Sequence, residues 1–424
     1  MKMNLFLMGS YWSPIEASRG TPSKSHHRAQ GQPYRDSVWG IRCDCRVSSI
    51  FHGRFYRRNL LNRRSRSIQG ERQSSVVAIK AEGQVGRGGR SAFHAAAFSS
   101  YGGETSVDVI ERDGDGFPSF IPREYIEEIE EPAALEVLKR MQMANLSVMP
   151  ELGLVKTAYV YEAGEGHGEQ ETRTAFVLLH GFDSSMLEFR RFIPLLKTLG
   201  DVYVVDLAGW GFSDCGFSDA ETAADVTLGP IQKRRHLERF VQDVVGRPVV
   251  LLGTSLGGSV AIDFAVECSE WVTSLVLVDA QGFIDGIGPM SSMPRFLSEI
   301  GVQVLKSVAL RQMANKMAYF DKAKYATDDA MRIGRLHTHA PGWSQANVAF
   351  MQSGGYAVSR KVGMVPCPTL VVWGRQDEIL DPKYAAQFME VLPDAQLAWI
   401  EECGHVPALE QPHQLLQAIE RFVS

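Results

Sequence analysis

A serine flanked by glycines stands where an apolar segment gives way to a helical one. Gly253, Ser255 and Gly257 follow the apolar run at residues 248–252, and residues 259–268 have a helical composition. This order predicts a strand, a sharp turn and a helix, with the serine at the apex in a strained conformation. The glycines let the neighbouring chains approach closely. The serine hydroxyl would stand at a helix N-terminus, where negative charge is favoured.

An aspartate and a histidine follow in the order that such a serine requires. Asp377 comes shortly after the apolar run 368–374, and His405 comes after the run 397–400. A serine hydroxyl is a poor nucleophile at neutral pH, so His405 would take its proton and later give it to the leaving group. Asp377 would hold the imidazole in the correct tautomer and stabilise the imidazolium.

Each of these residues also has a plain structural interpretation. Ser255 could serve as a helix N-cap, and His405 could be an ordinary loop histidine. Asp381 and Asp279, which follows the apolar run 273–278, compete with Asp377 for the role of the acid. We favour Asp377 and keep Asp279 as the alternative.

These residues can meet only if the ends of several strands lie together. Seven apolar runs, separated by helical-length segments, occur at residues 155–161, 174–179, 201–205, 248–252, 273–278, 368–374 and 397–400. Strands that alternate with helices predict an α/β fold with a mostly parallel twisted sheet and helices on both faces. Ligands bind at the carboxyl ends of such strands, which is where Ser255, Asp377 and His405 fall. We expect 155–161 to be an edge strand.

Over residues 150–424 the sequence resembles the α/β-hydrolase superfamily. The motifs that carry the resemblance are His180-Gly181-Phe182, DLAGWGFSD at 206–214, GTSLGG at 253–258, WGRQD at 373–377, and Gly404-His405 with Pro407. The segment HGFDSSMLEFRRFIPLL resembles a plant and algal plastid group of serine hydrolases. The resemblance implies an α/β-hydrolase fold, a Ser-His-Asp triad, and an oxyanion hole formed by the backbone N–H groups of Phe182 and Leu256. It also implies that His180 buttresses the oxyanion loop.

In residues 281–367 the alternation of predicted strands and helices stops. The resemblance implies that this segment is a helical cap inserted after the sixth strand. Apolar spacing predicts helices over 302–320, 328–337 and 341–351. Methionine adapts to irregular apolar space, which favours an apolar substrate. Our candidates for the substrate pocket are Trp210, Met290, Met313, Met317, Trp343 and Phe350, although the same residues could simply form the core of the cap.

The N-terminal part has a different composition. Residues 1–80 carry 15 Lys/Arg against 4 Asp/Glu and contain 12 serines, which is typical of a targeting peptide. We expect a chloroplast address, with a mitochondrial one as the alternative. Residues 81–121 are expected to be a disordered linker and 122–150 an N-terminal helical extension, followed by a hydrolase core at 151–280 and 368–424 with the cap at 281–367.

Composition limits the partners. The whole chain has a net charge of −5, and residues 1–80 contribute 15 − 4 = +11, so the remainder carries −16. An acidic body argues against nucleic acid or an anionic membrane as the main partner. No apolar run approaches 18 residues, so no spanning segment is expected. The oligomeric state is left open.

The sequence contains no pattern for a cofactor or a metal. Neither a P-loop nor a dinucleotide fingerprint occurs at a strand-to-helix turn. His337 and His339 have no cysteines or carboxylates at zinc spacing, so they are expected to be solvated or core residues. Four cysteines beyond the leader are scattered and favour reduced thiols.

We therefore predict a serine hydrolase that cleaves a carboxylic ester of a small apolar substrate through an acyl-enzyme. One alternative is a carbon–carbon bond hydrolase that cleaves a diketone with the same triad. The other is a ligand receptor or scaffold that keeps the pocket without turnover. A dehalogenase or an epoxide hydrolase would need an aspartate at position 255, where the chain has a serine.

Overall fold

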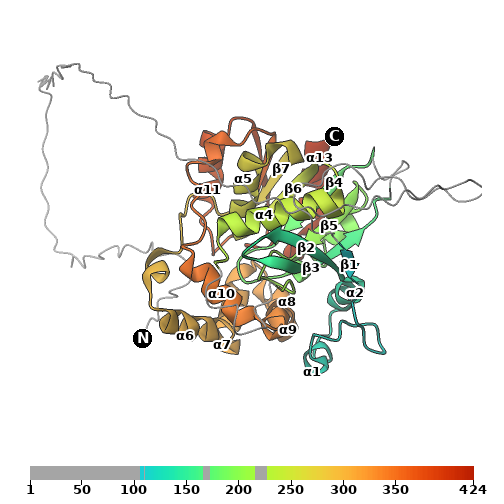
Figure 1. Ribbon diagram of the computed structural model, residues 1–424. Coiled ribbons are helices and arrows are strands. Elements are labelled where there is room, and N and C mark those ends of the chain that lie inside the picture. Colours follow the sequence, from blue (N-terminus) through green and yellow to red (C-terminus); the bar gives the residue numbers. More distant parts are fainter. Residues whose placement is uncertain (1–105, 109, 166–171, 215–226) are drawn as a thin grey trace, which may run out of the picture. The chain divides into compact units, whose positions relative to one another are not determined.

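The computed structural model describes residues 106–108, 110–165, 172–214 and 227–424 (Figure 1). The predicted targeting peptide at 1–80 and the first part of the predicted linker lie outside these residues. Nine strands form one sheet in the order β1-β2-β3-β5-β4-β6-β7-β8-β9. Their bounds are β1 (Ser106–Asp108), β2 (Gln142–Met149), β3 (Gly153–Glu162), β4 (Ala175–Leu179), β5 (Asp201–Val205), β6 (Val249–Thr254), β7 (Val272–Val278), β8 (Thr369–Gly374) and β9 (Ala395–Ile400).

The sheet is parallel from β5 through β9, which confirms the predicted fold class. Strands β1, β2, β3 and β5 pair antiparallel, whereas the pairs β5–β4, β4–β6, β6–β7, β7–β8 and β8–β9 are parallel. All the parallel strands therefore place their carboxyl ends along one edge, and the turns that follow β4, β6, β7, β8 and β9 meet there.

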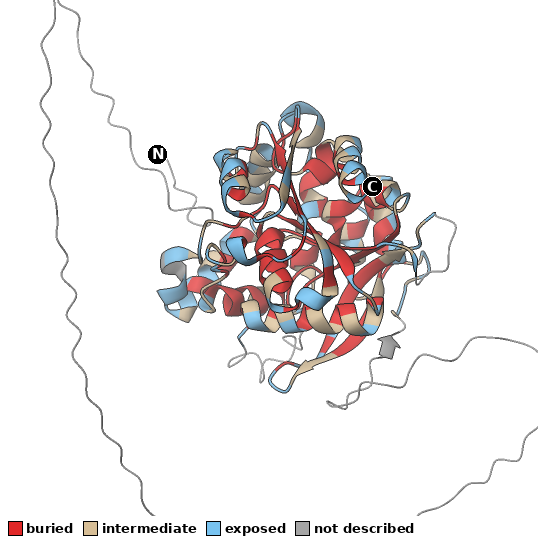
Figure 2. Ribbon diagram, turned by 90° about the horizontal axis from the view of Figure 1, so that it is seen from above, coloured by how far each residue is buried: buried red, intermediate tan, exposed pale blue. Residues whose placement is uncertain are grey.

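Helices cover both faces of the sheet, as the near-continuous apolar strands require. On one face Val177 and Leu179 of β4 belong to the cluster that includes the helices α4 (Pro230–Phe240), α5 (Leu256–Glu267) and α11 (Lys383–Val391). On the other face Phe176 and Leu178 belong to the cluster of α2 (Pro132–Arg140), α3 (Ile193–Leu196) and α13 (Pro412–Val423). Figure 2 shows the buried strands at the centre between these layers. Short segments complete the body, namely α1 (Arg123–Ile126), η2 (Met186–Phe189), η3 (Val241–Val245), η4 (Ser269–Trp271) and α12 (Pro407–Glu410).

The predicted helical extension at 122–150 is wrong beyond Arg140. Residues Gln142–Met149 form β2, which pairs with both β1 and β3, so β3 is not the expected edge strand. The sequence of β2, QMANLSVM, contains good helix formers. The burial of one of its faces against the sheet overrides that local propensity.

The predicted linker at 81–121 is also too long. Strand β1 lies within it, and Phe117 and Ile121 are buried in the cluster with α2. Asp113 builds the turn before Phe117, because its carboxylate accepts the N–H groups of Asp115 and Phe117. Hydrogen bonds of this kind, from the backbone to an aspartate side chain, can fix a short segment that forms no helix or strand.

Between β7 and β8 the chain is helical, as expected of a cap, although this insertion follows the seventh described strand rather than the sixth. Its elements are η5 (Gly288–Ser292), α6 (Arg295–Leu305), α7 (Val308–Ala318), α8 (Lys322–Tyr325), α9 (Asp328–Arg335), η6 (Leu336–His339), α10 (Trp343–Gln352) and η7 (Val362–Met364).

The single helix predicted over 302–320 is broken into α6 and α7. Ser307 has an extended backbone, with φ −65° and ψ 138°, and its hydroxyl donates to the carbonyl of Val304 at 2.7 Å. Arg335 of α9 donates to the carbonyl of Lys306 at 2.8 Å. These two bonds satisfy carbonyl groups that the end of α6 would otherwise leave unpaired. In the described residues, no helix combines the length and the apolar character needed to cross a bilayer.

Candidate active site

Ser255 occupies the turn between β6 and α5 with φ 51° and ψ −122°. Such a conformation costs a non-glycine residue about 1–3 kcal/mol, so the surrounding structure must impose it. A β-carbon on Gly253 would lie 2.3 Å from the carbonyl oxygen of Gly257, and one on Gly257 would lie 2.4 Å from that of Leu179. The two glycines are therefore required by close backbone contacts, as the sequence predicted.

Backbone hydrogen bonds fix this turn against the next strand. The N–H of Ser255 donates to the carbonyl of Val278 at 3.1 Å, and the carbonyl of Ser255 accepts from Gln281 and Gly258, both at 2.9 Å. Ser255 is thus anchored to the end of β7 as well as to the start of α5.

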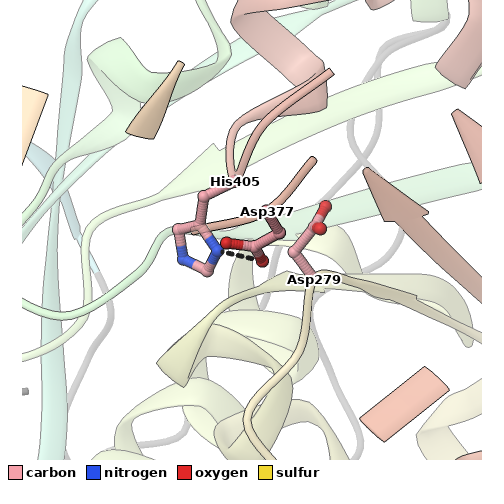
Figure 3. Close-up of side chains that lie close together, drawn as sticks. All are labelled: Asp279, Asp377 and His405. Atoms are coloured by element: carbon pink, nitrogen blue, oxygen red, sulfur yellow. Dashed lines mark hydrogen bonds and ion pairs between the residues drawn. The ribbon is translucent and has the colours of Figure 1, made fainter. Parts of the chain in front are cut away.

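His405 and Asp377 are joined at the ends of the last two strands (Figure 3). The Nδ1 atom of His405 lies 2.7 Å from Oδ2 of Asp377, and both residues are only 7% exposed. The other oxygen of Asp377 accepts the N–H groups of Ile379 and Leu380, so both oxygens of the carboxylate act as acceptors. His405 therefore carries its proton on Nδ1, and the lone pair of Nε2 is left for another partner.

The charge balance of the site favours the imidazolium. Burial lowers the pKa of His405, but the charge and the hydrogen bond of Asp377 and the charge of Glu188 outweigh burial, so the pKa is raised above its ordinary value. A base with this property would accept a proton readily from a neighbouring hydroxyl.

Asp279, the alternative acid, lies beside this pair, but the hydrogen bond of His405 Nδ1 goes to Asp377. Oxygens of Asp279 and Asp377 and a nitrogen of His405 all lie within 4.8 Å of one another. Asp279 is fully buried, has φ 43°, and accepts the N–H of Gly374 at 2.9 Å. Burial and the charge of Asp377 raise the pKa of Asp279 well above its usual range. Burial and a neighbouring carboxylate both disfavour the charged form of Asp279.

Two carboxylates and an imidazole are also ligand types for metal ions. A tetrahedral zinc ion with ligands at its usual distances holds their donor atoms roughly 3.3 Å apart. The 2.7 Å separation of His405 Nδ1 and Asp377 Oδ2 is instead that of a charge-assisted hydrogen bond. The geometry of this cluster therefore fits a carboxylate that orients a histidine better than it fits a metal site.

The predicted oxyanion loop lies against Ser255. A β-carbon on Gly181 would lie 3.2 Å from Cβ of Ser255 and 3.7 Å from its Oγ. Within the described part of the chain, no hydrogen bond from the N–H of Phe182 or of Leu256 is found. Both donors are thus available for a ligand atom, which is what an oxyanion hole requires.

His180 and Asp206 stabilise this loop from behind. His180 is fully buried and donates from Nδ1 to the carbonyl of Gly181 at 2.8 Å. Burial lowers the pKa of His180 to about 3, so it is neutral and fits the structural role that was expected. Asp206 accepts the N–H groups of Met186 and Phe212 at 2.6 and 2.8 Å, which ties the loop to the glycine-rich turn after β5.

The sequence did not reveal the importance of Asp183. This residue directly follows Phe182, has φ 49°, and accepts hydrogen bonds from Arg311 of α7, His337 of η6 and Trp343 of α10. His337 is buried, in line with the core alternative. A polar residue next to the oxyanion loop was visible in the sequence, but its three partners come from a distant segment that no spacing rule connects to it.

The predicted pocket residues separate into two groups. Trp210 and Phe350 are fully buried, with ring centroids 4.8 Å apart, and both pack against the ring of Phe182 at 6.1 and 5.8 Å. They support the oxyanion loop from the core. Trp343 is also buried and donates to Asp183.

The methionine candidates lie toward the surface of the cap. Met313 is 38% exposed, and Met317, on the same helix, is partly buried. Met290 falls in η5, but its side chain is outside what the structure describes. For all six candidates, contact with a substrate stays a prediction.

Comparisons with known proteins agree with this geometry. A model of the alpha/beta hydrolase family matches residues 176–418, which include Phe182, Ser255, Asp377 and His405. The chain belongs to the alpha/beta hydrolase family. This hydrolase is 34% identical over 312 residues to the alpha/beta hydrolase domain-containing protein VTE7 of Arabidopsis thaliana, covering 73% of its own length and 92% of that protein. The plant-type resemblance of the sequence is thereby confirmed.

More distant relatives include enzymes of two kinds. The hydrolase is 26% identical over 301 residues to the 2-hydroxy-6-oxo-6-(2'-aminophenyl)hexa-2,4-dienoic acid hydrolase of Metapseudomonas resinovorans, covering 69% of this chain and 95% of that protein. Among solved structures, it is similar to a thermophilic esterase from Thermogutta terrifontis with a TM-score of 0.53 and 20% identity, covering 66% of this chain and 98% of that one. This last similarity supports the fold alone.

Proposed function

We propose that this member of the family is a serine hydrolase that cleaves a carboxylic ester of an apolar substrate through an acyl-enzyme. The observation that carries the proposal is the 2.7 Å hydrogen bond between His405 and Asp377, at the edge of the sheet where the strained Ser255 turn also lies. A nucleophile, a base and a group that orients the base are the minimum for acyl transfer.

The proposed reaction has two halves. Ser255 Oγ attacks the ester carbonyl while its proton passes to Nε2 of His405, and the N–H groups of Phe182 and Leu256 stabilise the tetrahedral oxyanion. The intermediate collapses, His405 gives the proton to the departing alcohol, and the acyl group remains on Ser255. Water then attacks the acyl-enzyme by the same route, with His405 again as the base, and the free acid leaves.

The surface of the cap supports an apolar substrate. Eight of the twelve large hydrophobic side chains that are exposed among the described residues belong to the segment between β7 and β8. Three of them, Phe296, Ile300 and Val304, are spaced by four residues on α6. Phe296, Ile300 and Val348 line part of an open hollow of about 490 Å³, and its other lining residues are polar, namely Arg295, Glu299, Gln303, Ser344 and Gln345. Exposed apolar side chains concentrated in one segment are typical of a surface that meets an apolar ligand.

A diketone hydrolase is the second candidate, and the relative from Metapseudomonas resinovorans is the observation that favours it. The same triad could serve carbon–carbon bond cleavage. Initial rates on a p-nitrophenyl ester and on a vinylogous diketone, measured side by side, separate the two reactions.

The direct test of the proposal replaces the nucleophile. We expect Ser255→Ala to fold normally and to lose turnover of p-nitrophenyl esters by at least a factor of about 1000, since the nucleophile and its proton are removed together. Far-ultraviolet circular dichroism and the melting temperature provide the control for folding. Full activity in the variant would eliminate the proposal, and binding without turnover in the wild type would favour the receptor alternative.

We also propose a plastid location, based on the composition of residues 1–80 and on the similarity to a plant protein. Residues 1–80 fused to a fluorescent protein should direct it to chloroplasts in leaf cells. Accumulation in mitochondria would support the alternative address, and a cytosolic signal would contradict both.

A further inference from the structure

A second carboxylate borders the site. Glu188 lies in η2, the turn after the oxyanion loop, and is partly buried. Its Oε2 atom and Oγ of Ser255 are each 3.7 Å from the position that a β-carbon on Gly181 would occupy. The carboxylate and the nucleophile therefore both border the backbone of Gly181. The mechanism proposed above does not use it.

Glu188 bridges the two backbone segments that carry the oxyanion donors. One carboxylate oxygen accepts the N–H of Gly181 at 3.1 Å. The other accepts the hydroxyl of Thr254, the residue before Ser255. Gly181 directly precedes Phe182, and Thr254 lies two residues before Leu256, so the bridge joins the two segments just before the donors. It sets the distance between the two segments.

Glu188 also acts on the candidate base through its charge. The carboxylate contributes to the raised pKa of His405, together with Asp377. Other titratable groups near His405 include Asp279, Cys403 and Glu410. Burial raises the pKa of Asp279 and of Cys403, which disfavours the charged form of each. Glu410 directs its carboxylate to the N–H groups of Gly404, Phe320 and Asp321.

We propose that Glu188 is a positioning residue of this site: its carboxylate fixes the spacing of the two oxyanion donors, and its negative charge stabilises the imidazolium of His405. The inference rests on the proposed function for its catalytic consequence, but the effect on His405 holds whether or not the chain turns over an ester. An anion so close to a developing oxyanion carries an electrostatic cost. The two hydrogen bonds that Glu188 accepts reduce this cost, because they spread its charge over donors of the protein.

Glu188→Gln separates the two roles. The amide oxygen can still accept the N–H of Gly181, while its NH₂ group can donate to Thr254, whose hydroxyl can in turn donate to the carbonyl of Leu179. The bridge then survives without the charge. Glu188→Ala removes both, and Glu136→Gln, on the exposed side of α2, is the matched control.

The experiment is a histidine NMR titration of the full chain, with the His405 resonance identified by its absence from His405→Gln. We expect the pKa of His405 to fall by roughly 0.5–1 unit in Glu188→Gln, as removal of a nearby charge requires, and to stay unchanged in Glu136→Gln. An unchanged pKa in Glu188→Gln would overturn the role of the charge, and this readout needs no substrate.

Ester kinetics then test the bridge. The acid limb of kcat/KM should move to lower pH in Glu188→Gln by the same amount, with kcat on the plateau within about fivefold of the wild type. Glu188→Ala should lose a further 10- to 100-fold in kcat, somewhat less than the loss of a whole oxyanion donor. If both variants lost the same factor in kcat and the acid limb of kcat/KM did not move, Glu188 would have only a packing role. Inactivity of the wild type would count against the proposed function, while the titration would still decide the effect on His405.

Discussion

Asp183, next to Phe182 of the proposed oxyanion loop, accepts a hydrogen bond at 2.8 Å from the indole of Trp343 in α10, a helix of the proposed cap. Arg311 and His337, from two further cap elements, donate to the same carboxylate. Burial raises the pKa of Asp183, but the charge of Arg311 and the bonds from His337 and Trp343 outweigh it, so the pKa is lowered. The buried carboxylate thus joins the loop after β4 to the cap.

Removal of this carboxylate should destabilise the fold and the site together. We expect Asp183→Ala to cost about 3–5 kcal/mol in the free energy of unfolding, because Arg311 is left as a largely buried cation without its partner. Urea denaturation measures this cost. The exposed pair of Arg332 and Glu128 is the control, and Arg332→Ala should cost less than about 1 kcal/mol. Equal losses of unfolding free energy in the two variants would show that the buried network stabilises the fold no more than an exposed ion pair does.

The two aspartates near His405 should differ sharply in their effect on catalysis. Asp377→Asn should lower kcat by about 10⁴-fold, because the amide favours the wrong tautomer of the imidazole. Asp279→Asn should lower kcat by less than about tenfold, since a neutral amide resembles the protonated acid that the raised pKa of Asp279 indicates. Steady-state kinetics on one ester compare the two variants directly. A larger loss in Asp279→Asn would transfer the role of the acid to that residue.

Acid pH should weaken the fold through His236. This histidine is fully buried, its Nδ1 accepts the N–H of Ala208 at 3.1 Å, and its Nε2 lies 2.7 Å from the hydroxyl of Thr157. Burial lowers the pKa of His236 to about 3. In the unfolded chain it would take up a proton near pH 6.5, so the stability present above that pH is lost as the pH falls towards 3.

The effect of His236 can be isolated by comparison with a variant. Burial raises the pKa of Asp206 to about 8, and this carboxyl acts in the opposite direction, so the wild type alone is not informative. The difference in unfolding free energy between the wild type and His236→Gln should shrink by about 2 kcal/mol between pH 7 and pH 5. A difference that stays constant would mean that His236 is not neutral in the folded protein.

The sequence was sufficient for the elements whose signals are local. The strand that ends at Thr254, the strained turn at Ser255 and the glycines around it follow from apolar runs and small residues at fixed spacing. The parallel order of the central strands follows from the helical segments between them. For the same reason the sequence alone predicts that Asp377 and His405 lie at one edge of the sheet.

The features that were missed depend on contacts between distant segments. Strand β2 has the composition of a helix and becomes a strand because β3 and β1 pair with it. Glu188 and Asp183 sit within the recognised motif segment, yet their partners Thr254 and Trp343 are 66 and 160 residues away. No periodicity links such pairs, and only the folded arrangement reveals them.

The central claim is that Ser255 is an activated nucleophile, and covalent labelling tests it most directly. The full chain is treated with a fluorophosphonate at pH 8, digested, and mapped by mass spectrometry. We expect a single adduct on Ser255 in the wild type and a rate of labelling at least about 100-fold lower in His405→Gln, where no base takes the proton. An unlabelled Ser255 in folded protein, or equal labelling without His405, would contradict it.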